Sequence, residues 1–243
     1  EMRESDWSSD VCSSDLFVGE IGGRRVAFMP RHGRNHTILP HLINYRANVW
    51  AMKSIGVGRV ISPCAAGSLQ THVKPGDFVI CDQFVDWTDG RKSTTIQGPI
   101  VSHPSPAELY CPEMREIAIK VAKEQGIDVH ETGTVVVLNG PRFSTKSESK
   151  FFTGQGWEVI NMTAFPENYL VREMDMCPIN ISLITDYDAG LVGDVAPVSH
   201  HEVIKVFNSN LDKLKTMLFK FIEEIPFERK ACECAQTSSS SQL

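Results

Sequence analysis

The chain has 243 residues, of which 42% are hydrophobic and 22% are charged, a composition typical of one globular α/β domain with a large core. Its net charge of −6 argues against a nucleic-acid partner, which would require a basic face, but leaves room for a small anionic substrate beside a local basic cluster. No apolar stretch approaches the ~20 residues of a membrane span and no secretory signal is present, so we expect a cytoplasmic protein without a membrane partner.

The two ends of the chain differ in composition from its middle. Residues 1–16 contain few apolar residues and repeat Ser-Ser-Asp. We interpret them as a disordered or foreign segment, joined to a chain that is truncated at its start. The folded domain is expected to span residues 17–226, and the serine-rich segment 227–243 is expected to be a disordered tail.

Apolar periodicity and turn residues predict alternating strands and helices. Strands are expected at 26–29, 59–62, 77–85, 129–138, 157–160 and 179–184, and helices at 38–55, 112–125, around 148, at 166–174 and at 199–225. Residues 86–108 are polar and rich in Gly and Pro, which predicts a long loop. This alternation predicts a single α/β domain, with a mixed, largely parallel twisted sheet flanked by helices.

Polar or small residues follow four of the predicted strands, at the strand ends where open α/β sheets bind ligands. The four segments are residues 30–36, 62–68, 161–163 and 185–188. Each segment alone is as readily explained by a solvated turn. Four of them in one chain favour a binding site.

Two of these segments suggest a particular chemistry. Asp186 and Asp188 point the same way if strand pairing continues through them, and paired carboxylates can hold and protonate a nitrogenous base. Arg31 and His32 follow the strand at 26–29, and an arginine offers a fixed fork of donors that suits phosphate. The competing interpretations are a solvated carboxylate pair and a basic surface turn.

Seven cysteines lie at positions 12, 64, 81, 111, 177, 232 and 234. Several fall in or beside apolar segments, which favours buried free thiols in a reducing compartment. A single Cys-x-Cys at 232–234 is weak support for zinc. We therefore expect two exposed thiols in the tail and no metal site.

Four motifs in order resemble the trimeric purine nucleoside phosphorylases, and most of all their methylthioadenosine phosphorylase branch. They are Pro-Arg-His-Gly-Arg-x-His-Thr at 30–37, Gly-Pro-Arg-Phe-Ser at 140–144, Asn-Met-Thr at 161–163 and Thr-Asp-Tyr-Asp at 185–188. The resemblance covers roughly residues 19–224. It implies a nucleoside phosphorylase-like fold, a homotrimer, and phosphorolysis of 5′-methylthioadenosine in purine and methionine salvage. Inorganic phosphate would be the co-substrate, and no cofactor is expected.

The resemblance also implies roles for individual residues. Phosphate would be bound by Arg31, His32, Cys64, Ala65 and Thr163. The nucleoside would be bound by Asp186 at the purine N7, Asp188 near the group at C6, Ser144 in the purine pocket, Met162 under the sugar, His200 near the 5′ substituent and His103 from a neighbouring subunit. Asp186 and Asp188 would be the catalytic pair.

Several alternatives remain open at this point. Cys64 stands where many relatives have a threonine hydroxyl for phosphate, and residues 1–16 lack the strand and glycine-rich turn with which such enzymes begin. A carboxylate at Asp188 favours a 6-amino purine, but a phosphorylase with broader or 6-oxopurine preference is the main alternative. The others are hydrolysis by water and a non-enzymatic chain, either an inactive fragment or a purine-binding module.

Overall fold

The computed structural model describes residues 16–99, 101–189 and 198–242. Its strands are β1 (Phe17–Ile21), β2 (Arg24–Phe28), β3 (Arg59–Ser68), β4 (Phe78–Ile80), β5 (Gln83–Trp87), β6 (Val129–His130), β7 (Thr134–Leu138), β8 (Val159–Asn161) and β9 (Cys177–Asp186). Its α-helices are α1 (Tyr45–Ser54), α2 (Pro112–Glu124), α3 (Lys146–Gly154), α4 (Ala164–Glu173) and α5 (His200–Glu224). Short 3₁₀ helices are η2 (Pro40–Leu42) and η3 (Cys234–Gln236).

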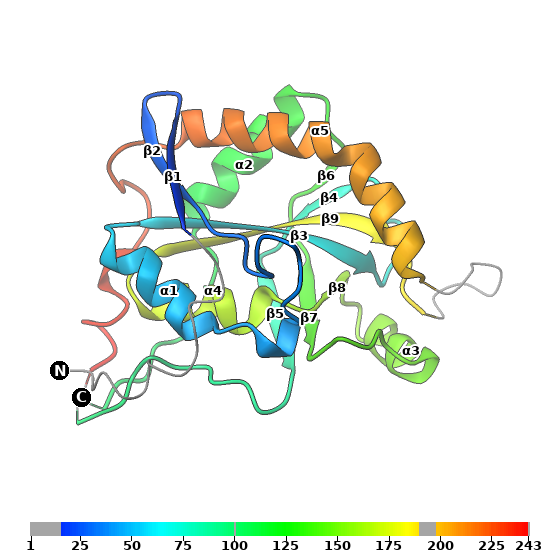
Figure 1. Ribbon diagram of the computed structural model, residues 1–243, viewed down its shortest axis with the longest axis horizontal. Helices are drawn as coiled ribbons and strands as arrows, with labels where there is room; N and C mark the ends of the chain where they lie inside the picture. The colour runs from blue at the N-terminus through cyan, green and yellow to red at the C-terminus, as the bar shows by residue number, and fades with distance from the viewer. Residues whose placement is uncertain (1–15, 100, 190–197, 243) are drawn as a thin grey trace.

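Seven strands form one sheet in the order β5-β7-β8-β3-β9-β4-β6 (Figure 1). Neighbours run parallel, except that β3–β8 and β4–β9 are antiparallel. The long strands β3 and β9 lie side by side at the centre and pair along their whole length. The expected mixed, largely parallel α/β sheet is confirmed.

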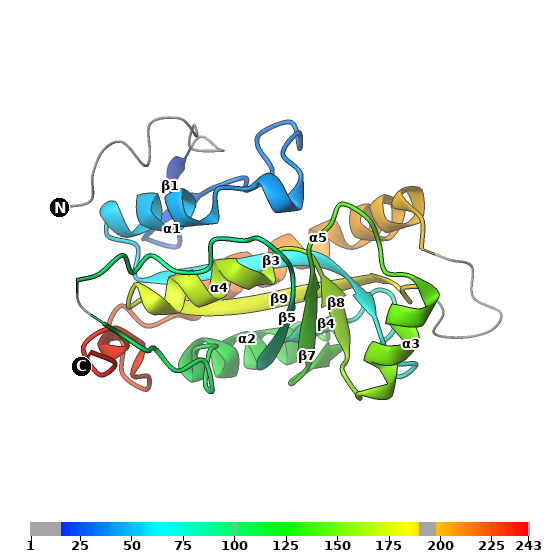
Figure 2. The same cartoon turned by 90° about the horizontal axis from the view of Figure 1, so that it is seen from below.

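Helices cover both faces of the central strands. Helices α2 and α5 pack on one face through Met114, Val121, Met217 and Phe221, against Ile179 and Ile181 of β9. Helices α1 and α4 cover the other face through Tyr45, Val49, Leu170 and Val171. Figure 2 shows α1 and α2 on opposite sides of β3 and β9. The alternating apolar residues of β9 are therefore buried on both sides, as expected for a central strand.

Strands β1 and β2 form a separate antiparallel hairpin beside α5. Its turn is Gly22-Gly23, with φ values of +55° and +74°. A two-residue hairpin turn of this hand needs a positive φ at both positions, which glycine adopts without steric cost. The sequence predicted β2 but not β1.

Several predicted elements have different bounds in the structure. The segment 77–85 forms two strands, because β4 pairs with β9 and β6 whereas β5 pairs with β7 at the opposite edge. The segment 129–138 divides in the same way into β6 and β7. The helix expected from residue 38 starts at Tyr45, where the Asn44 side chain caps the Ala47 N–H at 3.1 Å.

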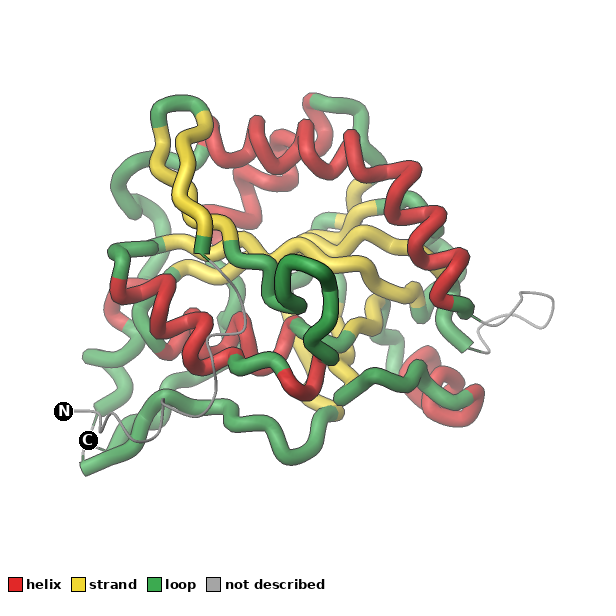
Figure 3. The backbone as a smooth tube through the Cα atoms, viewed as in Figure 1, coloured by secondary structure: helices red, strands yellow, loops and turns green. Residues whose placement is uncertain are grey.

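The loop after β5 forms no helix or strand over residues 88–99 and 101–110, apart from one bridge between Ser102 and Gln242. Figure 3 shows it as a long green stretch that reaches the C-terminal segment. No helix in the described part of the chain has the length and apolar character that crossing a membrane requires.

The segment 227–242, expected to be disordered, lies against the domain. Glu113 accepts hydrogen bonds from the backbone N–H groups of Lys230 and Ala231, at 3.1 and 3.3 Å. Cys234 is fully buried and Cys232 is half-buried. The prediction of two exposed thiols is therefore wrong, because partners distant in sequence cover this segment. The segment expected at 1–16 lies outside the described residues, except for Leu16.

Candidate active site

Asp186 is the last residue of the central strand β9. The sequence predicted a site at this carboxyl end of the strand. The Asp186 carboxylate accepts hydrogen bonds from the Thr185 hydroxyl at 2.8 Å and from the Asp188 N–H at 2.9 Å. Asp188 has a φ of +51°, so strand alternation stops before it and its backbone N–H turns towards the Asp186 carboxylate. Burial raises the pKa of Asp186 above its ordinary value, and the nearby Asp188 adds to this.

Asp188 is itself buried and fixed from another part of the chain. The Ser144 hydroxyl lies 2.5 Å from both of its carboxylate oxygens. Ser144 precedes Thr145, the N-cap of α3, and the start of this helix is fixed by a reciprocal capping pair of Thr145 and Glu148. The structure therefore brings together three of the residues expected to contact the purine.

Five consecutive residues of β3, from Pro63 to Gly67, join the separate parts of the site. The Ala66 carbonyl accepts a hydrogen bond from the Thr185 hydroxyl at 3.2 Å. A Cβ atom at Gly67 would stand 2.9 Å from Cγ2 of Ile160 and 3.0 Å from Oδ1 of Asp186, so a larger residue here would crowd both side chains. Ala65 is exposed although it lies on a central strand, so the structure leaves space above it.

The turn between β8 and α4 meets the same stretch of β3. Asn161 donates from Nδ2 to Sγ of Cys64 at 3.2 Å, and its Oδ1 accepts from the N–H groups of Thr163 and Ala164 at 3.3 and 3.2 Å. Thr163 is buried and Met162 is half-buried. Cys64, Met162 and Thr163 are thus neighbours, as expected.

Arg31 forms an ion pair that the sequence did not indicate. Its Nε and Nη2 donate to the two carboxylate oxygens of Glu167 at 2.7 and 2.8 Å, and its Nη1 donates to the Pro63 carbonyl at 3.1 Å. Burial alone would lower the pKa of Arg31, but the Glu167 carboxylate raises it above the ordinary value. Glu167 lies in the first turn of α4, shortly after the polar residues that follow β8. Its closeness to this strand end is the sequence signal that could have marked Glu167 as a site residue.

His32 is held next to Arg31 in a defined tautomer. Its Nδ1 lies 2.9 Å from the Ile38 carbonyl, which can only accept, so Nδ1 carries the hydrogen. Burial lowers the pKa of His32 below its ordinary value, and the stacked ring of His36 lowers it further. The neutral ring therefore presents Nε2 as an acceptor.

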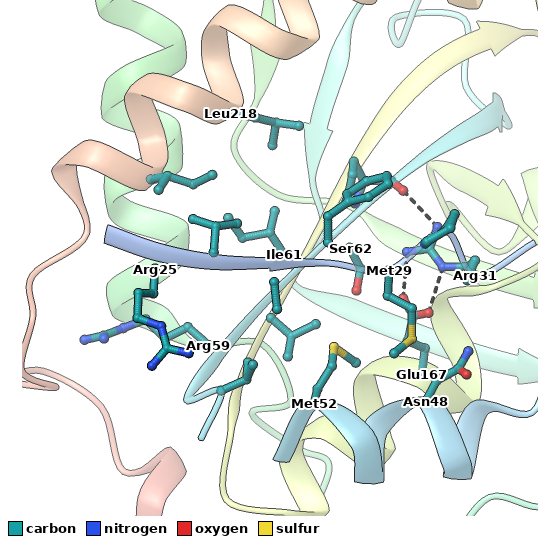
Figure 4. Close-up of a pocket in the computed structure, with 18 of the residues that line it drawn as sticks. Arg25, Met29, Arg31, Asn48, Met52, Arg59, Ile61, Ser62, Glu167 and Leu218 are labelled. Carbon is teal, nitrogen blue, oxygen red and sulfur yellow. Dashed lines mark hydrogen bonds and ion pairs between the residues drawn. The ribbon is translucent and has the colours of Figure 1, made fainter. Parts of the chain in front are cut away.

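A cavity of about 690 Å³ adjoins the first half of β3. Figure 4 shows Arg31 and Glu167 joined at one end of it, with Met52, Ile61 and Leu218 along the remaining wall. Its lining comes mainly from β2, the turn after β2, α1, β3 and α5, and α4 contributes Glu167. Asp186 and Asp188 do not line it, so the cavity adjoins the arginine end of the site rather than the carboxylate pair.

Two histidines expected near the nucleoside are not placed there by the described residues. His103 is exposed, and its backbone N–H donates to the Ser241 carbonyl at 3.0 Å. The loop that carries it and the end of β9 lie at opposite ends of the molecule in both ribbon views. His200 is the first residue of α5, but its side chain lies outside the described part of the structure.

Arg91, in the long loop, was missed and gave no sequence signal. Its guanidinium donates to the Met162 carbonyl at 2.9 Å, to the Phe165 carbonyl at 2.5 Å and to the Asn139 carbonyl at 2.8 Å. These carbonyls belong to the ends of β7 and β8 and to the start of α4. Arg91 thus ties the loop to the backbone that carries Met162 and Thr163.

A half-buried arginine with a neutral histidine beside Pro63 of β3, and a carboxylate pair beside Gly67 of the same strand, form an arrangement suited to binding an anion next to a nitrogenous base. The family model of the Phosphorylase superfamily matches residues 6–223, and the chain belongs to this family. The match begins inside the segment 1–16 that we expected to lie outside the domain. The predicted family and enzyme class are confirmed.

Similar proteins agree with this assignment. An S-methyl-5′-thioadenosine phosphorylase of Thermofilum pendens is 50% identical over 224 residues, or 92% of this chain and 84% of the relative. A purine nucleoside phosphorylase of Streptomyces coelicolor is 45% identical over 91% of this chain and 82% of the relative. A methylthioadenosine phosphorylase structure from Schistosoma mansoni, in complex with adenine, has a TM-score of 0.89 at 33% identity, over 95% of this chain and 88% of that chain.

Proposed function

We propose that the chain catalyses phosphorolysis of 5′-methylthioadenosine. Phosphate oxygen forms a bond to C1′ as the bond from C1′ to N9 breaks, which gives adenine and 5-methylthioribose 1-phosphate. The observation that carries this proposal is the carboxylate pair of Asp186 and Asp188, held at Gly67 of the strand whose Pro63 contacts Arg31. The names of the archaeal relatives support the same substrate.

Phosphate would be held by Arg31, His32, Thr163 and the β3 residues Cys64 and Ala65. Arg31 uses three N–H groups on Glu167 and Pro63, so two of its five donors remain for an anion. Nε2 of neutral His32 would accept the hydrogen of a protonated phosphate oxygen. Bound phosphate would also stabilise the positive charge that develops on the sugar in the transition state.

The departing adenine would be neutralised by Asp186. Burial favours the protonated form of this carboxyl, which suits a general acid directed at N7. Asp188, fixed by Ser144, would accept from the 6-amino group. Met162 would lie under the sugar, and His200 would lie near the 5′ substituent.

We propose in addition that the active assembly is a homotrimer with shared sites and a cytoplasmic location. His103 is exposed on a long loop, and this loop extends away from the end of β9 in both ribbon views. A histidine in that position can act at a nucleoside site only if the site belongs to a neighbouring copy. Closed symmetric assemblies are the common form of such sharing.

The alternative is a purine nucleoside phosphorylase with broader or 6-oxopurine preference, which the Streptomyces relative supports. Methylthioadenosine, adenosine, inosine and methylthioinosine should be compared in one assay, with and without phosphate. We expect adenine release from methylthioadenosine to be fastest and to require phosphate. Faster turnover of inosine would favour the alternative, and release without phosphate would indicate hydrolysis.

A further inference from the structure

Four cysteines from distant parts of the chain converge at the end of the molecule opposite Asp186. The Sγ atoms of Cys111, Cys177, Cys232 and Cys234 all lie within 4.8 Å of one another. Cys111 is the N-cap of α2, Cys177 is the first residue of β9, and the other two follow α5. Three of the four are buried and Cys232 is half-buried.

Backbone contacts that do not involve sulfur hold the cluster together. The Cys111 N–H donates to the Pro178 carbonyl at 2.9 Å, which joins the start of α2 to the start of β9. Glu113 binds the backbone just before Cys232, and Asp175 binds the Ser238 N–H at 2.8 Å, just after Cys234. The fold therefore fixes the Cys-x-Cys segment on both sides and aims it at Cys111 and Cys177.

The sulfur positions suit a tetrahedral metal site. Four thiolates at about 2.3 Å from one zinc ion lie about 3.8 Å from each other. The sulfurs of Cys177 and Cys232 are 3.6 Å apart. A disulfide bond would require about 2.0 Å.

The surroundings offset negative charge on the sulfurs. Four thiolates around a divalent ion carry a net charge of about −2. The guanidinium of Arg172 contacts Sγ of Cys234, and the positive N-terminal end of α2 lies at Cys111. Both features favour thiolates over thiols in this buried position.

We infer that Cys111, Cys177, Cys232 and Cys234 bind one structural zinc ion. Four sulfur ligands complete the preferred coordination of zinc and leave no open position for catalysis. The ion fastens the C-terminal segment to the starts of α2 and β9. A Cys-x-Cys alone gave little reason to expect zinc because the other two ligands lie 55 and more residues away in sequence.

The test uses the whole protein, purified in the presence of a non-chelating phosphine reductant. We expect elemental analysis to find one zinc ion per chain. Refolding with Co²⁺ should give the intense visible bands of a tetrahedral cobalt thiolate. Cys232→Ser and Cys111→Ser should lose most of the metal and the cobalt bands, whereas Cys81→Ser, a buried cysteine outside the cluster, should keep both.

Retention of metal by Cys232→Ser and Cys111→Ser to the same extent as the parent would overturn the assignment. Metal-free parent protein that fails to bind Co²⁺ would do the same, as would four cysteines found as disulfides under reducing conditions. If a serine variant does not fold, the parent alone decides the matter: a thiol-specific reagent should release zinc as four thiols react. Catalytic activity is not a readout, so the result is separate from the proposed reaction.

Discussion

The Ser144 hydroxyl lies 2.5 Å from each carboxylate oxygen of Asp188, although 44 residues separate the two in the chain. The contact joins the start of α3 to the turn after β9, and both residues are buried. A carboxylate held in this way presents its remaining lone pairs in a fixed direction. In the proposed reaction, that direction decides which group at C6 of the purine is accepted.

Asp188→Asn should shift preference from 6-amino towards 6-oxo purines, because the amide can donate to a carbonyl oxygen. Loss of a hydrogen bond to a charged group costs about 1.5–3 kcal/mol, or roughly 10- to 150-fold in the ratio of kcat/KM for methylthioadenosine over methylthioinosine. Ser144→Ala is the matched control, since it loosens Asp188 but keeps its charge, and it should lower both values without reversing the preference. An unchanged ratio in Asp188→Asn would remove Asp188 from the purine pocket.

Asp186→Ala should lower kcat by about two to four decades, because the leaving purine loses its proton donor. Circular dichroism should match that of the parent. Asp212→Asn, which alters an exposed carboxylate on α5, should leave kcat unchanged. Activity within a few-fold of the parent in well-folded Asp186→Ala would contradict the assignment.

Asp186→Asn should stabilise the protein at neutral pH. Because the pKa of Asp186 is raised in the folded state, the folded chain binds this proton more tightly than the unfolded chain does. Stability of the parent therefore falls as pH rises from the ordinary aspartate pKa through the raised value. The difference in unfolding free energy between variant and parent, measured in urea, should grow across that window and then level off. A difference that is independent of pH would show that Asp186 titrates normally.

Arg31→Lys should weaken phosphate binding and lower Tm, although it conserves charge. A lysine cannot reproduce the two-pronged contact with Glu167 and still reach the Pro63 carbonyl. The apparent KM for phosphate should rise more than that for the nucleoside. Glu167→Gln serves as the comparison, because it weakens the ion pair and leaves the guanidinium in place. If Arg31→Lys has an unaltered phosphate KM, Arg31 only stabilises the fold.

Mixed subunits should test the shared site. His103→Ala and Asp186→Ala are each expected to be nearly inactive. After the two are unfolded together and reassembled, some interfaces should pair an intact His103 with an intact Asp186 and recover part of the activity. Each variant refolded alone is the control. A monomeric mass for active protein, or no recovery after subunit exchange has been verified by native mass spectrometry, would rule out shared sites.

The sequence predicted the strand ends of the site well, because apolar runs followed by polar residues are local patterns. β9 and Asp186, β8 and Asn161, and β2 and Arg31 were all found in this way. Strand partners were not predictable from the same patterns. The segment 77–85 looks continuous, yet β4 and β5 join opposite parts of the sheet.

Contacts between distant residues were the main omission. Arg31 and Glu167 lie 136 residues apart, and the sequence around either residue does not indicate that the two form an ion pair. Asp188 was expected to follow strand alternation, whereas its positive φ and its Ser144 contact give it another direction. The serine-rich composition of the tail predicted disorder. In the structure, contacts with Glu113, Asp175 and the four-cysteine cluster hold the tail against the domain.

Arg91 anchors the first part of the long loop to the domain. Its guanidinium donates to backbone carbonyls after β7, after β8 and in α4, and also to the Asn139 side chain, while the far part of the loop lies against the C-terminal segment. The described parts of the loop are therefore anchored on both sides, at Arg91 and at Ser102. In the proposed trimer, His103 would therefore be presented to a neighbouring site by a loop that its own chain supports on both sides.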